Sequence, residues 1–183
     1  MITAHVFLAV SVDGYIARPD GDISWLLQRD DPTEDHGYAD FIADKDMIVM
    51  GRGSYEKILA IDTWPYELPV LVLSGQLADA AVPEALQGKV SFSDLAPRQA
   101  MEALAAQGVR RVYVDGGRLV HAFLRSGLVA DMVLTTVPVL LGSGRTLFGE
   151  LPHDIDLTLV ASRSFPSGLV QSTYRVNKDR VKQ

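Results

Sequence analysis

Apolar and polar residues alternate along the chain in two distinct patterns. Short apolar runs rich in β-branched residues predict buried strands, whereas apolar positions three and four residues apart predict amphipathic helices. Strands are expected in the segments HVFLAVSV (5–12), MIVMG (47–51), LPVLVLSG (68–75), VSFS (90–93), RRVYVDGG (110–117) and DMVLTTVPVLLGSG (131–144). Helices are expected between them, at residues 38–42, 52–61, 97–108 and 118–127.

Three segments depart from this alternation. Residues 17–37 are polar and contain proline and glycine, which predicts a long loop with one helical turn. Pro138 interrupts the last apolar run and is expected to mark an edge or a bulge. Residues 155–165 and 169–176 flank a Pro-Ser-Gly sequence and predict two antiparallel strands joined by a turn.

Strands that alternate with helices, followed by a hairpin, predict an α/β fold. We expect a mixed, mostly parallel sheet flanked by helices on both faces, with a C-terminal antiparallel hairpin. The chain has 183 residues, of which 48% are hydrophobic, and this is enough for one sizeable core. A single domain over residues 1–183 is therefore expected.

Composition narrows the function classes. Without cysteine the chain has no disulfide, thiol nucleophile or thiolate metal site. A net charge of −6 argues against a general nucleic-acid or anionic-membrane surface. Neither a leader pattern nor 18 uninterrupted apolar residues occur, so a cytoplasmic protein is expected. The four histidines are scattered, and no metal site is expected.

Glycine-bearing turns follow four of the predicted strands. They contain Gly51-Arg52-Gly53-Ser54, Ser74-Gly75, Gly116-Gly117-Arg118 and Gly142-Ser143-Gly144-Arg145. The carboxyl ends of parallel strands are where open sheets bind ligands, and helix N-termini there offer free N–H groups to phosphates. Each turn alone is more often only a tight turn, but several at equivalent ends favour an anionic ligand. No G-x-G-x-x-G or P-loop pattern is present, so an ordinary Rossmann or P-loop site is not expected.

Several segments together resemble one known family. They are AVSVDGYIA, DGDISWL, MIVMGRGSYE, VLVLSG, VYVDGGRLVHAFL and TTVPVLLGSGRTLF. Their order and approximate spacing are similar to those of the reductase domain at the C-terminus of the bacterial riboflavin-biosynthesis deaminase–reductase. That family is related in fold to dihydrofolate reductase. The resemblance covers nearly the whole chain and implies a dihydrofolate reductase-like fold, NADPH as cofactor and a homodimer.

The resemblance also implies roles for individual residues. Asp115 corresponds to an acid that faces the substrate, where the riboflavin reductases typically carry Glu, and Asp13 is a second catalytic candidate. Ser24 and Trp25 fall near a Ser and a Trp that line the substrate pocket. The implied cofactor-binding residues lie beside the nicotinamide, at two diphosphate-binding turns and at the adenosine side: Ala9, Val10, Gly14, Ile16, Gly51, Arg52, Gly53, Ser54, Leu73, Ser74, Gly75, Gly116, Gly117, Arg118, Leu119 and Val120.

Each acid also has a purely structural interpretation. Asp13 could simply start an Asp-Gly turn, and Asp115 could cap the helix that follows it. Trp25 could be an ordinary core residue.

The implied function is NADPH-dependent reduction of a small heterocycle, like that of 5-amino-6-(5-phosphoribosylamino)uracil in riboflavin synthesis. Dihydrofolate reductase-like activity and non-catalytic binding of NADPH or another phosphate ligand are the alternatives. A small-molecule substrate is expected, with neither a nucleic-acid nor a membrane partner.

Overall fold

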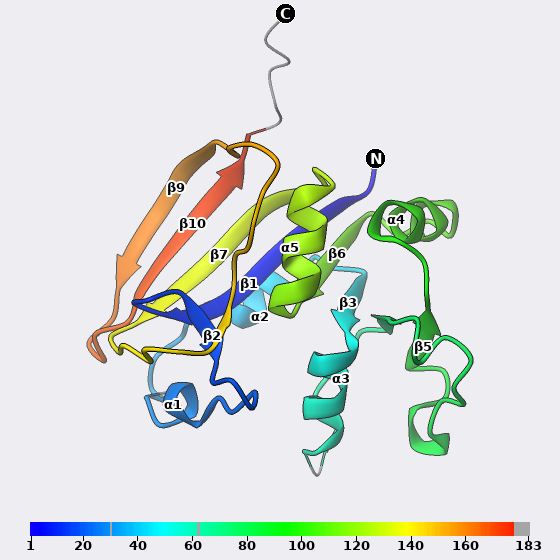
Figure 1. The fold of residues 1–183 in the computed structure, drawn as a ribbon, viewed down its shortest axis with the longest axis horizontal. Helices are drawn as coiled ribbons and strands as arrows, with labels where there is room; N and C mark the ends of the chain where they lie inside the picture. The colour runs from blue at the N-terminus through cyan, green and yellow to red at the C-terminus, as the bar shows by residue number, and fades with distance from the viewer. Residues whose placement is uncertain (30, 62, 178–183) are drawn as a thin grey trace, which may run out of the picture.

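A computed structural model describes residues 1–29, 31–61 and 63–177 of the chain. Its main feature is an eight-stranded sheet with the order β5-β4-β3-β6-β1-β7-β10-β9 (Figure 1). The strands of this sheet are β1 (Thr3–Ser11), β3 (Met47–Gly51), β4 (Val70–Leu73), β5 (Val90–Ser93), β6 (Arg111–Asp115), β7 (Val129–Val137), β9 (Leu157–Ser164) and β10 (Val170–Val176).

Six neighbouring strands, from β5 to β7, pair in parallel, whereas β10 pairs antiparallel with both β7 and β9. This is the mostly parallel sheet with a C-terminal hairpin that the sequence predicts. The helices are α1 (Ser24–Leu27), α2 (Tyr38–Ile42), α3 (Arg52–Leu59), α4 (Pro97–Ala106) and α5 (Gly117–Arg125), with a short 3₁₀ helix, η1 (Glu84–Leu86). None of the helices in the described ranges is long and apolar enough to cross a membrane.

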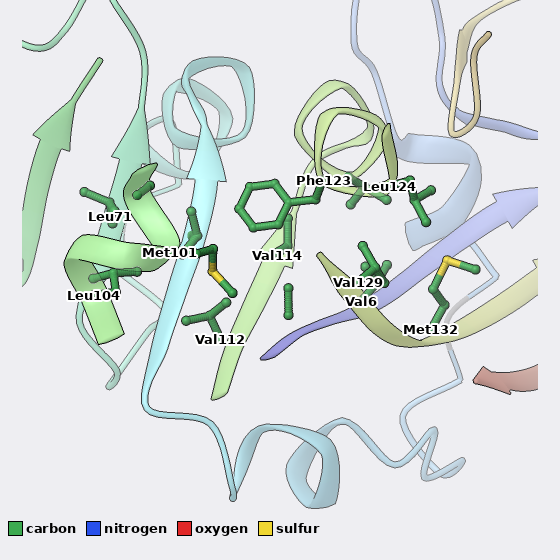
Figure 2. Packing of buried hydrophobic residues seen from close by; sticks show 14 of the residues in the cluster. Val6, Leu71, Met101, Leu104, Val112, Val114, Phe123, Leu124, Val129 and Met132 are labelled. Carbon is green, nitrogen blue, oxygen red and sulfur yellow. The ribbon is translucent and has the colours of Figure 1, made fainter. Parts of the chain in front are cut away.

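Helices cover both faces of the parallel region of the sheet. Successive side chains of each strand point to opposite faces, so each strand contributes to both cores. Val112 and Val114 of β6 pack under α4 and α5, together with Phe123 and Met101 (Figure 2). Tyr113, between the two valines, points to the other face. There the core consists of side chains from β3, β4, α2 and α3, with Phe92 of β5: Ile48, Met50, Val70, Val72, Tyr55, Phe41, Ile42 and Phe92.

Two local features differ from the sequence prediction. Pro138 does not mark an edge or a bulge: β7 is an interior strand that ends at Val137, directly before the proline. Beyond it, the Val139 N–H donates to the Val137 carbonyl, and the Val139 carbonyl accepts from the Val12 N–H at 3.0 Å. The second feature is a small antiparallel sheet of β2 (Tyr15–Ala17) and β8 (Arg145–Thr146), which the sequence patterns did not indicate.

Candidate functional site

A large cleft lies where β1, β3 and β6 end and where α3 and α5 begin. Its volume is about 920 Å³, near the upper end for small-molecule sites. The small β2–β8 sheet and the loop after β2 form its opposite wall. Of the residues predicted for the site, the cleft wall brings together Ala9, Ile16, Gly51, Arg52, Gly53, Ser54, Asp115, Gly116, Gly117, Arg118 and Leu119.

The other predicted residues do not line this cleft. Val120 belongs to α5 and points into the core, where it is fully buried. Leu73, Ser74 and Gly75 lie at the end of β4, beyond the cleft wall, and Val10, Asp13, Gly14, Ser24 and Trp25 are also outside it.

Packing within the protein explains why two adjacent glycines stand at the start of α5. Gly116 has a φ of +92°, and a Cβ on it would lie 2.5 Å from the Ser54 hydroxyl oxygen. A Cβ on Gly117 would lie 2.5 Å from Cδ1 of Ile16 and 3.1 Å from the Thr146 carbonyl oxygen. Glycine therefore lets α5 approach both α3 and the β2–β8 sheet closely, in addition to leaving backbone open to the cleft.

Asp115 ends β6, and its carboxyl group is enclosed at the cleft wall. It accepts hydrogen bonds from the Ser54 hydroxyl, the Tyr113 hydroxyl and the Gly116 N–H. Burial raises the pKa of Asp115 above its ordinary value, although these three donors act in the opposite direction. Asp115 is not the N-cap of α5, because Gly116 occupies that position.

Aromatic rings surround the Asp115 side chain on the face away from α5. Tyr113 packs edge-on against Phe41 and Tyr38 of α2. Tyr66, from the loop between α3 and β4, lines the cleft itself. Burial is the main cause that raises the pKa of Tyr66, and the negative charge of Asp115 is the second. Burial also raises the pKa of Tyr38 and Tyr113, so all three tyrosines are neutral near pH 7.

The cleft wall also carries four cationic side chains: Arg52, Lys57, Arg118 and Arg145. Arg52 donates to Glu56 at 2.7 Å, one turn further along α3. Arg145 is held in another way. Its guanidinium group lies flat over Gly21, where a Cβ would meet three guanidinium atoms at 3.1 Å, and its Nε donates to the Pro19 carbonyl at 3.3 Å. An excess of cations in one cleft of an acidic protein favours an anionic ligand.

Asp13 links two loops outside the cleft. Its carboxylate accepts from the Ser11 hydroxyl at 2.6 Å and, across the fold, from the N–H groups of Leu141 and Gly142 at 3.0 and 2.7 Å. The Ser11 hydroxyl, followed by the backbone donors, lowers the pKa of Asp13. Through these contacts Asp13 holds the turn between β1 and β2 against the segment that follows β7.

Ser24 and Trp25 belong to the short helix α1. The Ser24 hydroxyl donates to Asp22 at 2.6 Å. Trp25 is only 2% exposed and packs in an apolar cluster with Val137, Phe165 and Leu169. Trp25 therefore has the packing of a core residue, which was the alternative interpretation of the sequence.

Sequence reasoning missed Tyr66 and Lys57 of the cleft wall, and it named Arg145 within a candidate turn but not as a site residue. Arg145 had a signal, because it ends the glycine-rich Gly142–Arg145 turn. Lys57 follows Gly53 by four residues and so lies on the same face of α3, which a helical projection could have indicated. Tyr66 lies in an irregular loop, and no periodicity places it.

Comparisons with known proteins agree with this architecture. The model of the RibD C-terminal domain family matches residues 3–171. "Uncharacterized protein YwjB" of Bacillus subtilis is 31% identical over 164 residues, which are 87% of this chain and 90% of the relative.

Two solved structures have similar folds. The "Putative riboflavin biosynthesis protein" from Shewanella sp. PV-4 is 35% identical, with a TM-score of 0.90 over 96% of this chain and 99% of that one. The diaminohydroxyphosphoribosylaminopyrimidine deaminase/5-amino-6-(5-phosphoribosylamino)uracil reductase of Thermotoga maritima has a TM-score of 0.75 at 14% identity. The alignment with that protein covers 96% of this chain and 57% of the longer one. At this identity the likeness concerns the fold alone. The dihydrofolate reductase-like fold expected from the sequence is confirmed.

Proposed function

The chain belongs to the RibD C-terminal domain family, and from this premise we propose that it is an NADPH-dependent reductase of a small heterocycle. The substrate class is a pyrimidine- or pteridine-like ring. Reduction of 5-amino-6-(5-phosphoribosylamino)uracil is the first activity to test. One observation carries the proposal: a single cleft combines open glycine backbone and cationic side chains with an enclosed carboxyl group.

The residues present fit NADPH. The cofactor is a long polyanion, so it needs backbone N–H groups and cations along one groove and an apolar surface for its nicotinamide ring. Two helix starts meet in the cleft, at Gly51–Ser54 and at Gly116–Leu119, with Arg52 and Arg118 beside them. Ala9 and Ile16 offer the apolar wall. When bound, the reduced nicotinamide supplies a hydride ion.

The chain's own contribution to the chemistry is orientation and a proton. The raised pKa of Asp115 favours a carboxyl group that holds its proton closer to neutral pH than an exposed aspartate would. A heterocycle that accepts a hydride on carbon gains charge on the adjoining nitrogen or oxygen, and that atom must be protonated. Asp115 faces the cleft and carries that proton. The apolar side chains of Ile23 and Leu26, at the opposite wall, exclude water from the ring.

The experiment is NADPH oxidation, followed by absorbance, with a panel of pyrimidine and pteridine substrates. Asp115→Asn keeps the side chain's size but cannot supply the proton. We expect it to keep near-native melting and NADPH affinity and to lose most turnover. Asp115→Ala, which also removes the partner of Ser54 and Tyr113, is expected to melt lower as well. Tight NADPH binding without turnover of any heterocycle would point instead to a binding protein, and full activity of Asp115→Asn would remove this residue from the mechanism.

We also propose that the protein is a homodimer through the edge of its sheet. β9 is the outer strand, and its apolar side chains are exposed: Leu157 is 41%, Leu159 56% and Val160 59% exposed. An uncovered edge strand with exposed apolar residues is a surface that proteins normally protect. Sedimentation at micromolar concentration is expected to give about twice 20.0 kDa. A monomer of 20.0 kDa would contradict the dimer.

A further inference from the structure

The Tyr113 hydroxyl lies between two acceptors. It is 3.1 Å from the carbonyl oxygen of Phe7 in β1 and 3.2 Å from Oδ1 of Asp115. One hydroxyl proton can serve only one of these acceptors well at a time. The hydroxyl oxygen also has lone pairs that can accept a hydrogen bond, so the same group can reverse its role toward Asp115.

An enclosed carboxyl group that gives up and regains a proton needs partners for both of its forms. The ionised form of Asp115 accepts from Ser54, Tyr113 and the Gly116 N–H. The protonated form needs an acceptor for its own O–H. A buried polar group without a partner costs about 1–3 kcal/mol, which would resist the change of state in each turnover.

We propose that Tyr113 is a positioning residue that reverses its hydrogen bond as Asp115 gains and loses its proton. When Asp115 is ionised, the Tyr113 hydroxyl donates to Oδ1. When Asp115 is protonated, the carboxyl O–H donates to the Tyr113 oxygen, and the Tyr113 hydroxyl donates to the Phe7 carbonyl. One proton leaves the carboxyl group for the substrate and one returns from water at the cleft mouth, and Tyr113 itself stays neutral. This inference rests on the proposed function.

The side chains that face Asp115 do not change their own protonation state near neutral pH. Three tyrosines face it: Tyr113 on its own strand, Tyr38 from α2 and Tyr66 from the α3–β4 loop. Burial raises the pKa of each of these phenols, so all three are neutral near pH 7. The partner from α3, Ser54, does not titrate.

The test begins with the ligand-free protein, so that it does not depend on turnover. Protein labelled with ¹³C at the aspartate carboxyl carbons is titrated by NMR, and the Asp115 signal is identified by its loss in Asp115→Asn. Tyr113→Phe removes only the hydroxyl. The ionised form of Asp115 then loses a charge-assisted hydrogen bond, and the protonated form loses a weaker, neutral one. Because the ionised form loses more, we expect the pKa of Asp115 to rise by about one pH unit. Tyr55→Phe is the matched control. Tyr55 belongs to the same core region, and its buried hydroxyl has no hydrogen-bond partner among the described residues. It should leave the Asp115 titration unchanged.

An unchanged or lowered Asp115 pKa in Tyr113→Phe would overturn the proposal. If Tyr113→Phe does not fold, wild-type protein labelled at the tyrosine ζ-carbons decides the question. The Tyr113 signal, identified by elimination with single phenylalanine variants of the other five tyrosines, must then move with the Asp115 titration. A Tyr113 signal that does not follow Asp115 would also overturn the proposal.

Turnover provides a separate readout. For a reductase that uses protonated Asp115, activity falls as the pH rises through the pKa of that group. Tyr113→Phe should move this alkaline limb upward by about one pH unit, with NADPH affinity unchanged. If Tyr113→Phe is active but its alkaline limb has not moved, the role of Tyr113 is contradicted, while the proposed function is not. Absence of NADPH-dependent turnover in wild-type protein would instead contradict the proposed function, while the NMR titration would still decide whether Tyr113 reverses its bond.

Discussion

Gly116→Ala is expected to be among the more damaging single-methyl changes in the chain, for two separable reasons. The backbone of Gly116 has φ +92° and ψ 130°, a region nearly exclusive to glycine, and an alanine there costs about 1–3 kcal/mol. The new methyl group would also lie 2.5 Å from the Ser54 hydroxyl oxygen. Ser54 must then rotate away and lose its bond to Asp115, which costs about 1.5–3 kcal/mol if Asp115 is charged.

A double-mutant cycle separates the two costs. In Ser54→Ala the hydroxyl is gone, and the remaining Cβ lies 3.7 Å from the position of the new methyl group, an ordinary contact. Gly116→Ala should therefore cost only the backbone strain in that background, about 1–3 kcal/mol. In the wild-type background it should cost about 2.5–6 kcal/mol. The difference measures the coupling between the two residues.

Urea unfolding followed by tryptophan fluorescence measures these free energies, since the chain has two tryptophans. Gly53→Ala is the control, because Gly53 lies in α3 with no positive φ and nothing within 4 Å of an added Cβ. It should be neutral or slightly stabilising, since alanine favours helix over glycine. Equal costs of Gly116→Ala in both backgrounds would refute the close approach of α3 and α5 described above.

Two further outcomes concern charge. Asp13→Asn should destabilise the protein at pH 7. Because hydrogen bonding lowers the pKa of Asp13 below its ordinary 3.8, its stabilising effect is present above that value and is lost as the pH falls through the folded-state pKa. Thermal melts should therefore show the two proteins converging in acid, and a constant difference down to pH 2 would be inconsistent with these contacts. Arg145→Ala should weaken NADPH or substrate binding about tenfold through a lost charge-assisted contact. Arg125→Ala, outside this cleft, should not, and identical affinities for both variants would remove Arg145 from the site.

The order of elements could be predicted from the sequence because local signals agree with the tertiary context. The run at residues 47–51 is buried on both sides, and the following Arg52–Leu59 segment has helical spacing, so strand, turn and helix were all predictable. The β2–β8 sheet was not, since its five residues pair across more than a hundred positions and have no periodicity of their own.

The site was predictable only in part, for the same reason. Glycine-rich turns at the ends of β3 and β6 meet in the cleft, because parallel strands end at one edge of the sheet. Nothing in the sequence around Trp25 distinguishes a pocket-lining residue from a core residue. Its place in the core depends on packing against Phe165, which is far away in the sequence. Arg145 reaches the cleft from the short strand β8 and Tyr66 from the loop between α3 and β4, and the paths of both segments depend on tertiary contacts.

The central claim is that the cleft binds NADPH, and equilibrium fluorescence titration of the ligand-free protein with NADPH and NADH tests it most directly. The cleft offers cations such as Arg52, and the acidic ribose-binding position of an NAD-type Rossmann unit is not recognisable in the sequence. We therefore predict saturable binding of both nucleotides with a clear preference for NADPH. Equal affinities or a preference for NADH would contradict the assigned cofactor, and failure of either nucleotide to bind would contradict the account of the site.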